Sequence, residues 1–252
     1  ASDGTSLFAV AVTGSTTVAD NATFVLKKIA VGGTKTTLGV SGDNGFKLTV
    51  GGSTIGNGTR NPVCLAASDR GVVIGTTDNA SGVVFAGLES DNTTGPFTIA
   101  NYGSGADNMS VATTSGCDMT YASNLNSGDN RTFYMAYDNV TVLNVFKLID
   151  NSSNAGGGAI TIGAPITQAL GAAAEGIHIG VNSDDAAVIL VDNGTNAILY
   201  RMDNSTATSL TLLYDYTSLS SGSGVALGVN GKKYTIVTGK AAKTNVRVFY
   251  DE

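Results

Sequence analysis

Few side chains in this sequence have the chemistry for acid–base or metal work. Its one histidine, His178, is the second residue of the apolar run IHIGVN, and Asp118 is the second residue of a similar run, CDMTYA. An imidazole and a carboxylate held side by side can transfer protons or bind a metal ion. A histidine that is packed in the interior and hydrogen-bonded to the backbone gives the same pattern, and we favour this second interpretation.

The motifs of the common enzyme classes are missing from the sequence. It contains no Ser-containing nucleophile elbow, CxxC, HExxH or phosphate-binding loop. A glycosidase needs two or three converging carboxylates, of which Asp118 is one candidate. The absence of tryptophan weighs against a sugar-binding cleft. The sequence therefore predicts a protein that is not an enzyme, with no catalytic residues, no metal and no cofactor.

An acidic corner recurs along the chain. Aspartates end apolar runs at intervals of roughly 50 residues, a period typical of propeller blades, at Asp43, Asp91, Asp150, Asp203 and Asp251. A catalytic carboxylate would occur once, whereas Asp and Asn recur at turns because their short side chains bond their own backbone. We interpret Asp203, in AILYRMDNST, as such a turn residue.

Strand-like runs surround each corner at the same period. Upstream lies a run such as FAVAVTG or VALGVNG, then one such as TFYMAYDN; a third run ends in the aspartate, and a fourth such as AITIG or FKLTV follows it. Alternating polarity, β-branched residues, and Gly, Asn and Asp at the ends are typical of strands joined by hairpins. The segment APITQALGAAAEG, from Ala164, is expected to be a loop or one helical turn.

Four antiparallel strands repeated five times predict an all-β fold, a five-bladed β-propeller with blades of roughly 50 residues and a last blade that is incomplete. The blades are expected over approximately residues 7–52, 62–103, 116–165, 176–216 and 224–252 of a single domain, 1–252. Innermost strands are crowded near a propeller axis. Equivalent positions in these strands are small, as that crowding requires: Ala11, Ala66, Thr120, Gly180 and Gly228.

One unit resembles a known repeat. The run AAVILVDNGTNAILYRMDNSTATSLTLL, residues 186–213, resembles the YVTN-type β-propeller repeat of archaeal and bacterial surface proteins. In that repeat a strand ending like VAN, a Gly/Asn hairpin, a V-x-V-I-D strand and an S-T turn follow one another. LVDNGTN matches the first hairpin here, and LYRMDNST matches the second. The resemblance implies a propeller of the kind found in surface proteins.

The two cysteines lie in neighbouring innermost strands. Cys64 is equivalent in the repeat to Asp118, which comes one position after Cys117. The two thiols are therefore expected on opposite faces of neighbouring strands, and these two faces are turned toward each other. A disulfide between Cys64 and Cys117 is therefore predicted, and it fits an exported protein. Two buried free thiols are the alternative.

The composition favours export. With 13% charged residues and a net charge of −6, the chain lacks the clustered Lys and Arg that bind nucleic acid. No apolar run reaches the roughly 20 residues of a membrane span, and the first residues, ASDGTS, look like a mature N-terminus. We therefore expect an extracellular or cell-surface protein with covalent glycans. The Asn-x-Ser/Thr sequons are at Asn21, Asn57, Asn79, Asn92, Asn108, Asn130, Asn139, Asn151, Asn193 and Asn204.

The last repeat stops after its third strand. Its final run, TNVRVFY, is expected to leave an open apolar edge, with Thr244, Val246, Val248 and Tyr250 as the residues available for assembly. An exposed edge of this kind accepts a strand from a partner. Either the N-terminal residues or a neighbouring subunit would complete the blade.

These features favour an exported, non-enzymatic structural protein whose identical subunits assemble into an extracellular filament, tube or surface layer. A propeller module that binds a glycan or a peptide is the first alternative. An axial-site hydrolase that uses Asp118 and His178, and a structural protein of a phage or virion, are the others.

Overall fold

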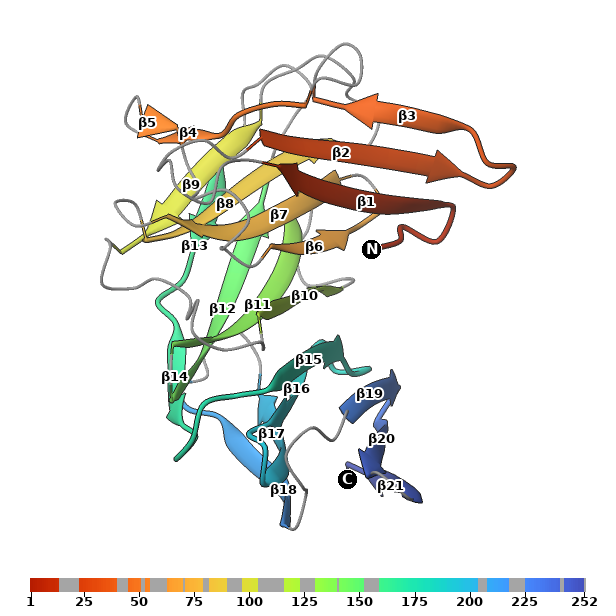
Figure 1. Ribbon diagram of the computed structural model, residues 1–252, viewed down its shortest axis with the longest axis vertical. Coiled ribbons are helices and arrows are strands. Elements are labelled where there is room, and N and C mark those ends of the chain that lie inside the picture. Colours follow the sequence, from red (N-terminus) through yellow and green to blue (C-terminus); the bar gives the residue numbers. More distant parts are fainter. Residues whose placement is uncertain are drawn as a thin grey trace. The chain divides into compact units, whose positions relative to one another are not determined.

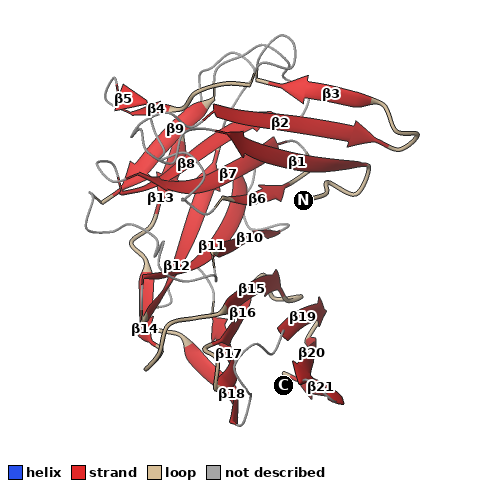
Figure 2. Cartoon of the chain, in the orientation of Figure 1, coloured by secondary structure: helices blue, strands red, loops and turns tan. Residues whose placement is uncertain are grey.

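The computed structural model describes residues 1–13, 23–39, 45–50, 53–54, 63–69, 71–78, 82–89, 97–103, 116–122, 130–139, 141–151, 159–203, 208–217, 225–240 and 243–251. Within these ranges the regular elements are strands, and none is a helix (Figures 1 and 2). The all-β fold expected from the alternating pattern is confirmed.

Among the described residues, five antiparallel sheets of three or more strands follow one another along the chain. The first consists of β1 (Ser6–Thr13), β2 (Thr23–Ala30) and β3 (Lys35–Leu38). The second consists of β6 (Cys64–Ala67), β7 (Gly71–Asp78), β8 (Gly82–Glu89) and β9 (Thr98–Tyr102). The third consists of β10 (Cys117–Ala122), β11 (Arg131–Asn139), β12 (Val142–Asp150) and β13 (Ile160–Ile162), with β14 (Ile166–Ala169) also paired to β12.

The fourth sheet consists of β15 (Gly176–Val181), β16 (Ala187–Asp192), β17 (Asn196–Met202) and β18 (Thr211–Thr217). The fifth consists of β19 (Val225–Asn230), β20 (Lys233–Lys240) and β21 (Lys243–Tyr250). Apart from β14, which pairs with β12, consecutive strands are neighbours in each of these sheets, which is the strand order of propeller blades (Figure 1). The five repeats read from the sequence are therefore five sheets.

Two segments differ from their expected structure. The stretch after Ala164 contains the strand β14, because Ile166 alternates into the core although Gly and Ala dominate the sequence around it. The run FKLTV meets the first sheet at Phe46, whose backbone exchanges two hydrogen bonds of 2.8 Å with Phe24 of β2. Its end, β4 (Thr49–Val50), pairs instead with β5 (Ser53–Thr54). The Phe46 ring stacks on Phe97 with ring centroids 4.1 Å apart.

The chain forms two compact units, which are described separately. One comprises residues 1–109, 126–133 and 148–162, and the other residues 110–125, 134–147 and 163–252. The expectation of a single domain over residues 1–252 stays a prediction.

The core of the first unit lies between the first and second sheets. Phe24 and Leu26 of β2 pack toward Val72 and Ile74 of β7, and all four side chains are at most 1% exposed. Successive residues of a strand point to opposite faces, so the other face of the first sheet carries the residues that alternate with these.

The second unit has a core on each side of the fourth sheet. Ile189 of β16 belongs to the cluster shared with the third sheet, whereas Leu190 belongs to the one shared with the fifth. A strand covered on both faces needs no polar residues, which explains the unbroken apolar run AVILV in β16. In β19, by contrast, residues alternate between exposed and partly buried.

Close packing of neighbouring sheets explains one of the small positions. A Cβ added to Gly180 would lie 2.6 Å from the Cγ2 atom of Val229 in β19, closer than atoms can approach. The prediction that this position must be small is thus correct, but it fails for Ala11, which is exposed. In the first sheet the residues facing the second sheet are large: Phe8, Val10 and Val12.

Candidate functional site

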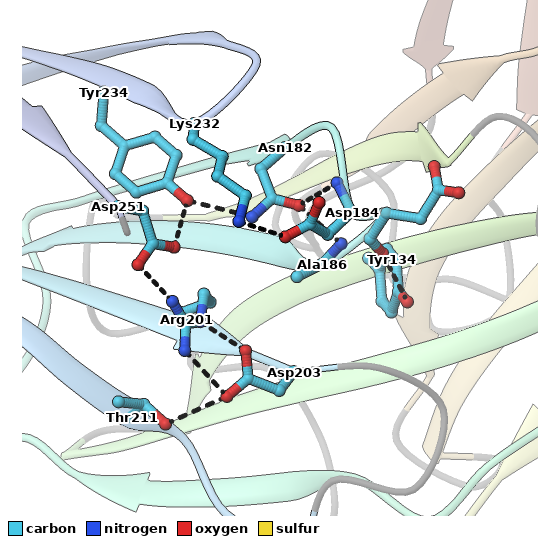
Figure 3. Close-up of polar contacts among 11 residues, drawn as sticks. Tyr134, Asn182, Asp184, Ala186, Arg201, Asp203, Thr211, Lys232, Tyr234 and Asp251 are labelled. Carbon is cyan, nitrogen blue, oxygen red and sulfur yellow. Dashed lines mark hydrogen bonds and ion pairs between the residues drawn. The ribbon is translucent and has the colours of Figure 1, made fainter.

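A network of charged and hydroxyl side chains joins the fourth and fifth sheets of the second unit (Figure 3). Arg201, in β17, forms ion pairs with Asp203 and with Asp251, which directly follows β21. A second nitrogen of Arg201 donates to Asp203 Oδ2 at 3.2 Å. The hydroxyl of Thr211, at the start of β18, donates to the same oxygen at 3.4 Å. The arginine therefore holds two carboxylates from two different sheets.

The same network continues through a tyrosine. The Tyr234 hydroxyl, from β20, donates to Asp251 Oδ2 at 2.7 Å and accepts a hydrogen bond from the Asn182 amide nitrogen at 3.0 Å. The Asn182 side chain also closes its own turn, because its Oδ1 atom accepts from the backbone nitrogens of Asp184 and Ala186. Both ends of the amide are thus occupied.

The turn between β15 and β16 shows how short polar side chains replace backbone hydrogen bonds. Asp185 has a positive φ of 58°, which Asp and Asn tolerate better than most residues. Its carbonyl oxygen accepts from the Tyr134 hydroxyl at 3.1 Å. Asp184 forms an exposed ion pair with Lys232, with 3.1 Å between Oδ2 and Nζ. The acidic run NSDDA is therefore a turn held by its neighbours.

The ionisation of the network follows from these contacts. Burial opposes ionisation of Asp251, but the hydrogen bonds from Arg201 and Tyr234 outweigh it and lower the pKa of this carboxyl. Burial, together with the hydrogen bond to Asp251, raises the pKa of Tyr234 to about 12. The hydrogen bonds to Asp203 and Asp251 raise the pKa of Arg201. These contacts therefore favour the ionised carboxylate of Asp251 and the protonated hydroxyl of Tyr234.

The structure places Asp118 on β10 and His178 on the adjacent strand β15, close enough for the charge of His178 to act on the pKa of Asp118. The Asp118 carboxylate accepts from the backbone nitrogens of Ile179 at 3.0 Å and Met119 at 2.9 Å, and so links β10 to β15. Burial raises the pKa of Asp118, and these hydrogen bonds reduce the rise. Ile177 belongs to the core shared with the third sheet, so His178, one residue on, points toward the fifth sheet.

This arrangement suits a structural role better than an acid–base pair. Asp118 and His178 are both described, and the structure shows no hydrogen bond between their side chains. Gly176 and Gly180, which flank His178 at alternate positions, both approach valines of β19. The histidine therefore lies near the contact between two sheets, and its role as a packed, hydrogen-bonded histidine stays a prediction.

The recurring aspartates are turn or strand-end residues with charged partners that the sequence pattern does not reveal. Asp150, at the end of β12, forms a buried ion pair with Arg131, the first residue of β11. The distance from Asp150 Oδ2 to Arg131 Nη2 is 3.1 Å. Asp203 and Asp251 share Arg201. Asp43 and Asp91 lie outside the described residues. The arginines were missed because nothing in the repeat marks them.

The Asp-Asn hairpin between β16 and β17 shows the expected turn chemistry. Asp192 Oδ1 accepts from the backbone nitrogen of Gly194 at 2.8 Å, and Asn193 Oδ1 accepts from the nitrogen of Asn196 at 2.8 Å. Gly194 has a φ of 81°, a conformation that glycine adopts without strain. The short side chains at this hairpin therefore bond their own backbone.

The sequons differ in accessibility. Asn130 and Asn151 are exposed and Asn139 is half-buried. Asn193 is only 8% exposed, and its amide nitrogen donates to the Leu170 carbonyl at 3.1 Å. The remaining sequons lie outside the described residues: Asn21, Asn57, Asn79, Asn92, Asn108 and Asn204. Glycosylation stays a prediction, and Asn193 is the position least suited to it.

The state of the two cysteines bears on the predicted disulfide. Neither Cys64 nor Cys117 is a free cysteine, and their pairing with each other stays a prediction.

Within the described ranges, no three His, Cys, Asp or Glu side chains come together as a metal site. Over the same ranges the structure contains no helix with the length and hydrophobicity of a membrane span.

The predicted assembly edge is the most exposed apolar feature of the fifth sheet. Val246 is 62%, Val248 44% and Tyr250 74% exposed. Thr244 belongs to β21, but its side chain lies outside what the structure describes. The order β19-β20-β21 leaves one edge of β21 without a partner among the described strands.

Comparisons with known proteins assign no family. No family model matches the chain, and no curated protein matches it, so the resemblance of residues 186–213 to the YVTN-type repeat stays a prediction. Among solved structures, one similar chain is described as "Crystal structure of the WD40 domain of SCAP from fission yeast". It has a TM-score of 0.43 and 9% identity, over 98% of this chain and 74% of that chain. Similarity at this level adds nothing to the fold assigned from strand pairing.

Proposed function

We propose that this protein is an exported, non-enzymatic structural subunit that assembles with identical copies into an extracellular filament, tube or surface layer. The observation that carries this proposal is the exposed apolar strand β21, with Val246, Val248 and Tyr250 on its surface. Large apolar side chains gathered on one strand are costly in water and mark contact sites.

The alternation in β21 separates a packed face from an open one. The Phe249 ring packs on Tyr214 of β18 with centroids 4.4 Å apart, and the Arg247 guanidinium lies 4.8 Å from the Tyr216 ring centroid. These residues turn inward toward the fourth sheet, so Val246, Val248 and Tyr250 point outward. The free edge of the strand also offers backbone donors and acceptors to a partner strand.

The N-terminal residues are engaged elsewhere. The Ala1 amino group donates to the Phe8 carbonyl at 3.0 Å, and the Phe8 nitrogen donates to the Ala1 carbonyl at 2.8 Å. Asp3 accepts from the nitrogens of Thr5 and Ser6, which closes the turn before β1. These residues therefore pair with their own sheet, and a neighbouring subunit as the partner of β21 is part of the proposal.

The acid–base groups also support a structural role. Asp118, Asp150, Asp203 and Asp251 all hold backbone amides or arginines. The sequons at Asn130 and Asn151, both exposed, support export. Export, glycosylation and the type of assembly are parts of the proposal.

Electron microscopy and sedimentation of the full chain test this function. Wild-type protein should form ordered assemblies, whereas Val248→Lys should shift it to single subunits, because a buried lysine without a partner is costly. Leu212→Lys is the matched control, since Leu212 of β18 is 56% exposed and belongs to another sheet. Wild-type protein that stays monomeric at high concentration would overturn the proposal.

A further inference from the structure

We propose that Asn230 is a site of spontaneous deamidation, at which the turn between β19 and β20 supplies the attacking nitrogen. Asparagine followed by glycine favours this reaction, because glycine has no Cβ to obstruct attack by its own backbone nitrogen. Such pairs begin at Asn44, Asn57, Asn193 and Asn230. The structure describes both residues of the last two pairs, which belong to the second unit, and their surroundings differ.

The reaction needs only the chain and water. The Gly231 backbone nitrogen attacks the side-chain carbonyl carbon of Asn230, so that a new C–N bond forms while the C–N bond of the side-chain amide breaks. The amide nitrogen leaves as ammonia and carries away the proton that the Gly231 nitrogen loses. Water then opens the cyclic imide at either of its carbonyls, which leaves aspartate or isoaspartate at position 230.

Both reacting groups of Asn230 and Gly231 are unengaged within the described ranges. Asn230 ends β19 and is exposed, and no described residue forms a hydrogen bond with its side-chain amide. Asn230 pairs with Lys233, so Gly231 lies in the turn and its nitrogen takes no part in the strand ladder. A Cβ added to Gly231 would meet no atom within 4 Å. Neighbouring atoms therefore obstruct neither cyclisation nor the entry of water.

In the hairpin of Asn193 and Gly194, by contrast, both reacting groups are held. The Gly194 nitrogen donates to Asp192 Oδ1 at 2.8 Å, so the attacking atom is already engaged. Asn193 is 8% exposed, and its amide nitrogen donates to the Leu170 carbonyl at 3.1 Å. Glu175 crowds the same turn, since a Cβ added to Gly194 would lie 2.7 Å from Glu175 Oε1. Cyclisation at Asn193 therefore requires these hydrogen bonds to break first.

The product at position 230 changes the contacts of the fifth sheet. Isoaspartate carries the main chain through an extra carbon, which disturbs the pairing of residue 230 with Lys233. Lys232, in the same turn, forms an ion pair with Asp184, and its carbonyl accepts from the Asp251 nitrogen at 2.9 Å (Figure 3). Isoaspartate should therefore loosen the ends of β20 and β21.

Timed peptide mapping of the full chain by mass spectrometry tests the assignment. In folded protein kept in mildly alkaline buffer, Asn230 should deamidate at least about tenfold faster than Asn193, which corresponds to about 1.4 kcal/mol between the two barriers. In urea-unfolded protein the two positions should react at similar rates, because the contacts that hold Asn193 are gone. Asn230→Gln should remove the fast site and leave the circular dichroism spectrum unchanged, since glutamine would have to form a larger ring.

Two results would overturn the assignment. One is a rate at Asn193 in the folded protein that equals or exceeds the rate at Asn230. The other is folded protein in which Asn230 stays intact although it reacts in the unfolded chain, because the turn would then protect it.

Asn230→Asp is the control for the effect on the sheet, since it adds the charge of the product without the extra backbone carbon. Aged protein that contains isoaspartate should show faster amide hydrogen exchange in β20 and β21 than this variant. Equal exchange in the two samples would overturn the proposed loosening.

Discussion

The Tyr234 hydroxyl donates to the Asp251 carboxylate over 2.7 Å, and this contact joins two strands of the last sheet to the arginine of the sheet before it. The bond lies within a chain of polar contacts that runs from Asn182 through Tyr234 and Asp251 to Arg201. The network ties the sheet with the open face to its neighbour.

The network makes the protein sensitive to alkali. The pKa of Tyr234 is raised to about 12, above its ordinary value of 10.0, so the folded state retains a proton that the unfolded chain loses first. Its contribution to stability is complete below pH 10 and should be lost as the pH rises toward 12. Tyr234→Phe should be less stable at pH 7 and should lose less stability between pH 10 and 12. Urea unfolding at several pH values measures both effects, and an identical alkaline loss in the variant would refute the assignment.

The local sequence pattern was sufficient to predict the strands, but not the polar side-chain contacts that join one sheet to the next. Alternation in runs such as VALGVN depends on nearest neighbours, so β19 and its equivalents were predicted correctly. Arg201 and Asp251 are far apart in the sequence, and only the packing of two sheets brings them together. The strand β14 escaped prediction because four residues are too few to show a period. Asp203 was interpreted as a turn residue, and the structure shows that its carboxylate binds the side chains of Arg201 and Thr211.

The buried pair Arg131–Asp150 should contribute more to stability than the exposed pair Lys232–Asp184. The Arg131 and Asp150 side chains are 3% and 0% exposed, so Asp150→Asn removes a charged partner from a buried guanidinium. We expect a loss of about 3–5 kcal/mol in the free energy of unfolding. Asp184→Asn is the control, since that pair is exposed and should contribute below about 1 kcal/mol. Equal losses in the two variants, measured by denaturant unfolding, would contradict this ranking.

Gly180 and Gly228 provide a matched test of sheet-to-sheet contact. A Cβ at Gly180 would meet Val229 Cγ2 at 2.6 Å, whereas the nearest atom to a Cβ at Gly228 is 3.8 Å away. Gly180→Ala should therefore destabilise the protein by about 1–3 kcal/mol, the usual cost of overpacking, and Val229→Ala should relieve part of that cost. Gly228→Ala should be close to neutral. Thermal unfolding measures the stability of each variant. Equal stability of Gly180→Ala and Gly228→Ala would show that the fifth sheet shifts to make room for the added Cβ.

Accessibility predicts which sequons carry glycans if the chain is exported through a glycosylating pathway. Asn130 and Asn151 are exposed, whereas Asn193 is buried and donates to the Leu170 carbonyl. Mass spectrometry of glycopeptides should find modification at the first two positions and an unmodified Asn193. Asn193→Gln is expected to destabilise the hairpin, because the longer side chain cannot keep the backbone bonds that Asn193 makes. Full occupancy at Asn193 would mean that the hairpin opens before the glycan is attached.

The predicted disulfide between Cys64 and Cys117 would stabilise the chain chiefly through its unfolded state. A covalent link between the two positions removes conformations from the unfolded ensemble, and a loop of this length corresponds to about 4 kcal/mol in the chain-entropy model. Neither cysteine is free in the structure, so a thiol reagent added to the denatured, unreduced protein should label neither. Reduction should then expose both thiols and lower the midpoint of denaturant unfolding. A Cys64→Ser, Cys117→Ser double variant should match the reduced protein in stability. Labelling of both cysteines without a reductant would refute the disulfide, whereas a covalent dimer that disappears on reduction would place the bond between two copies of the chain.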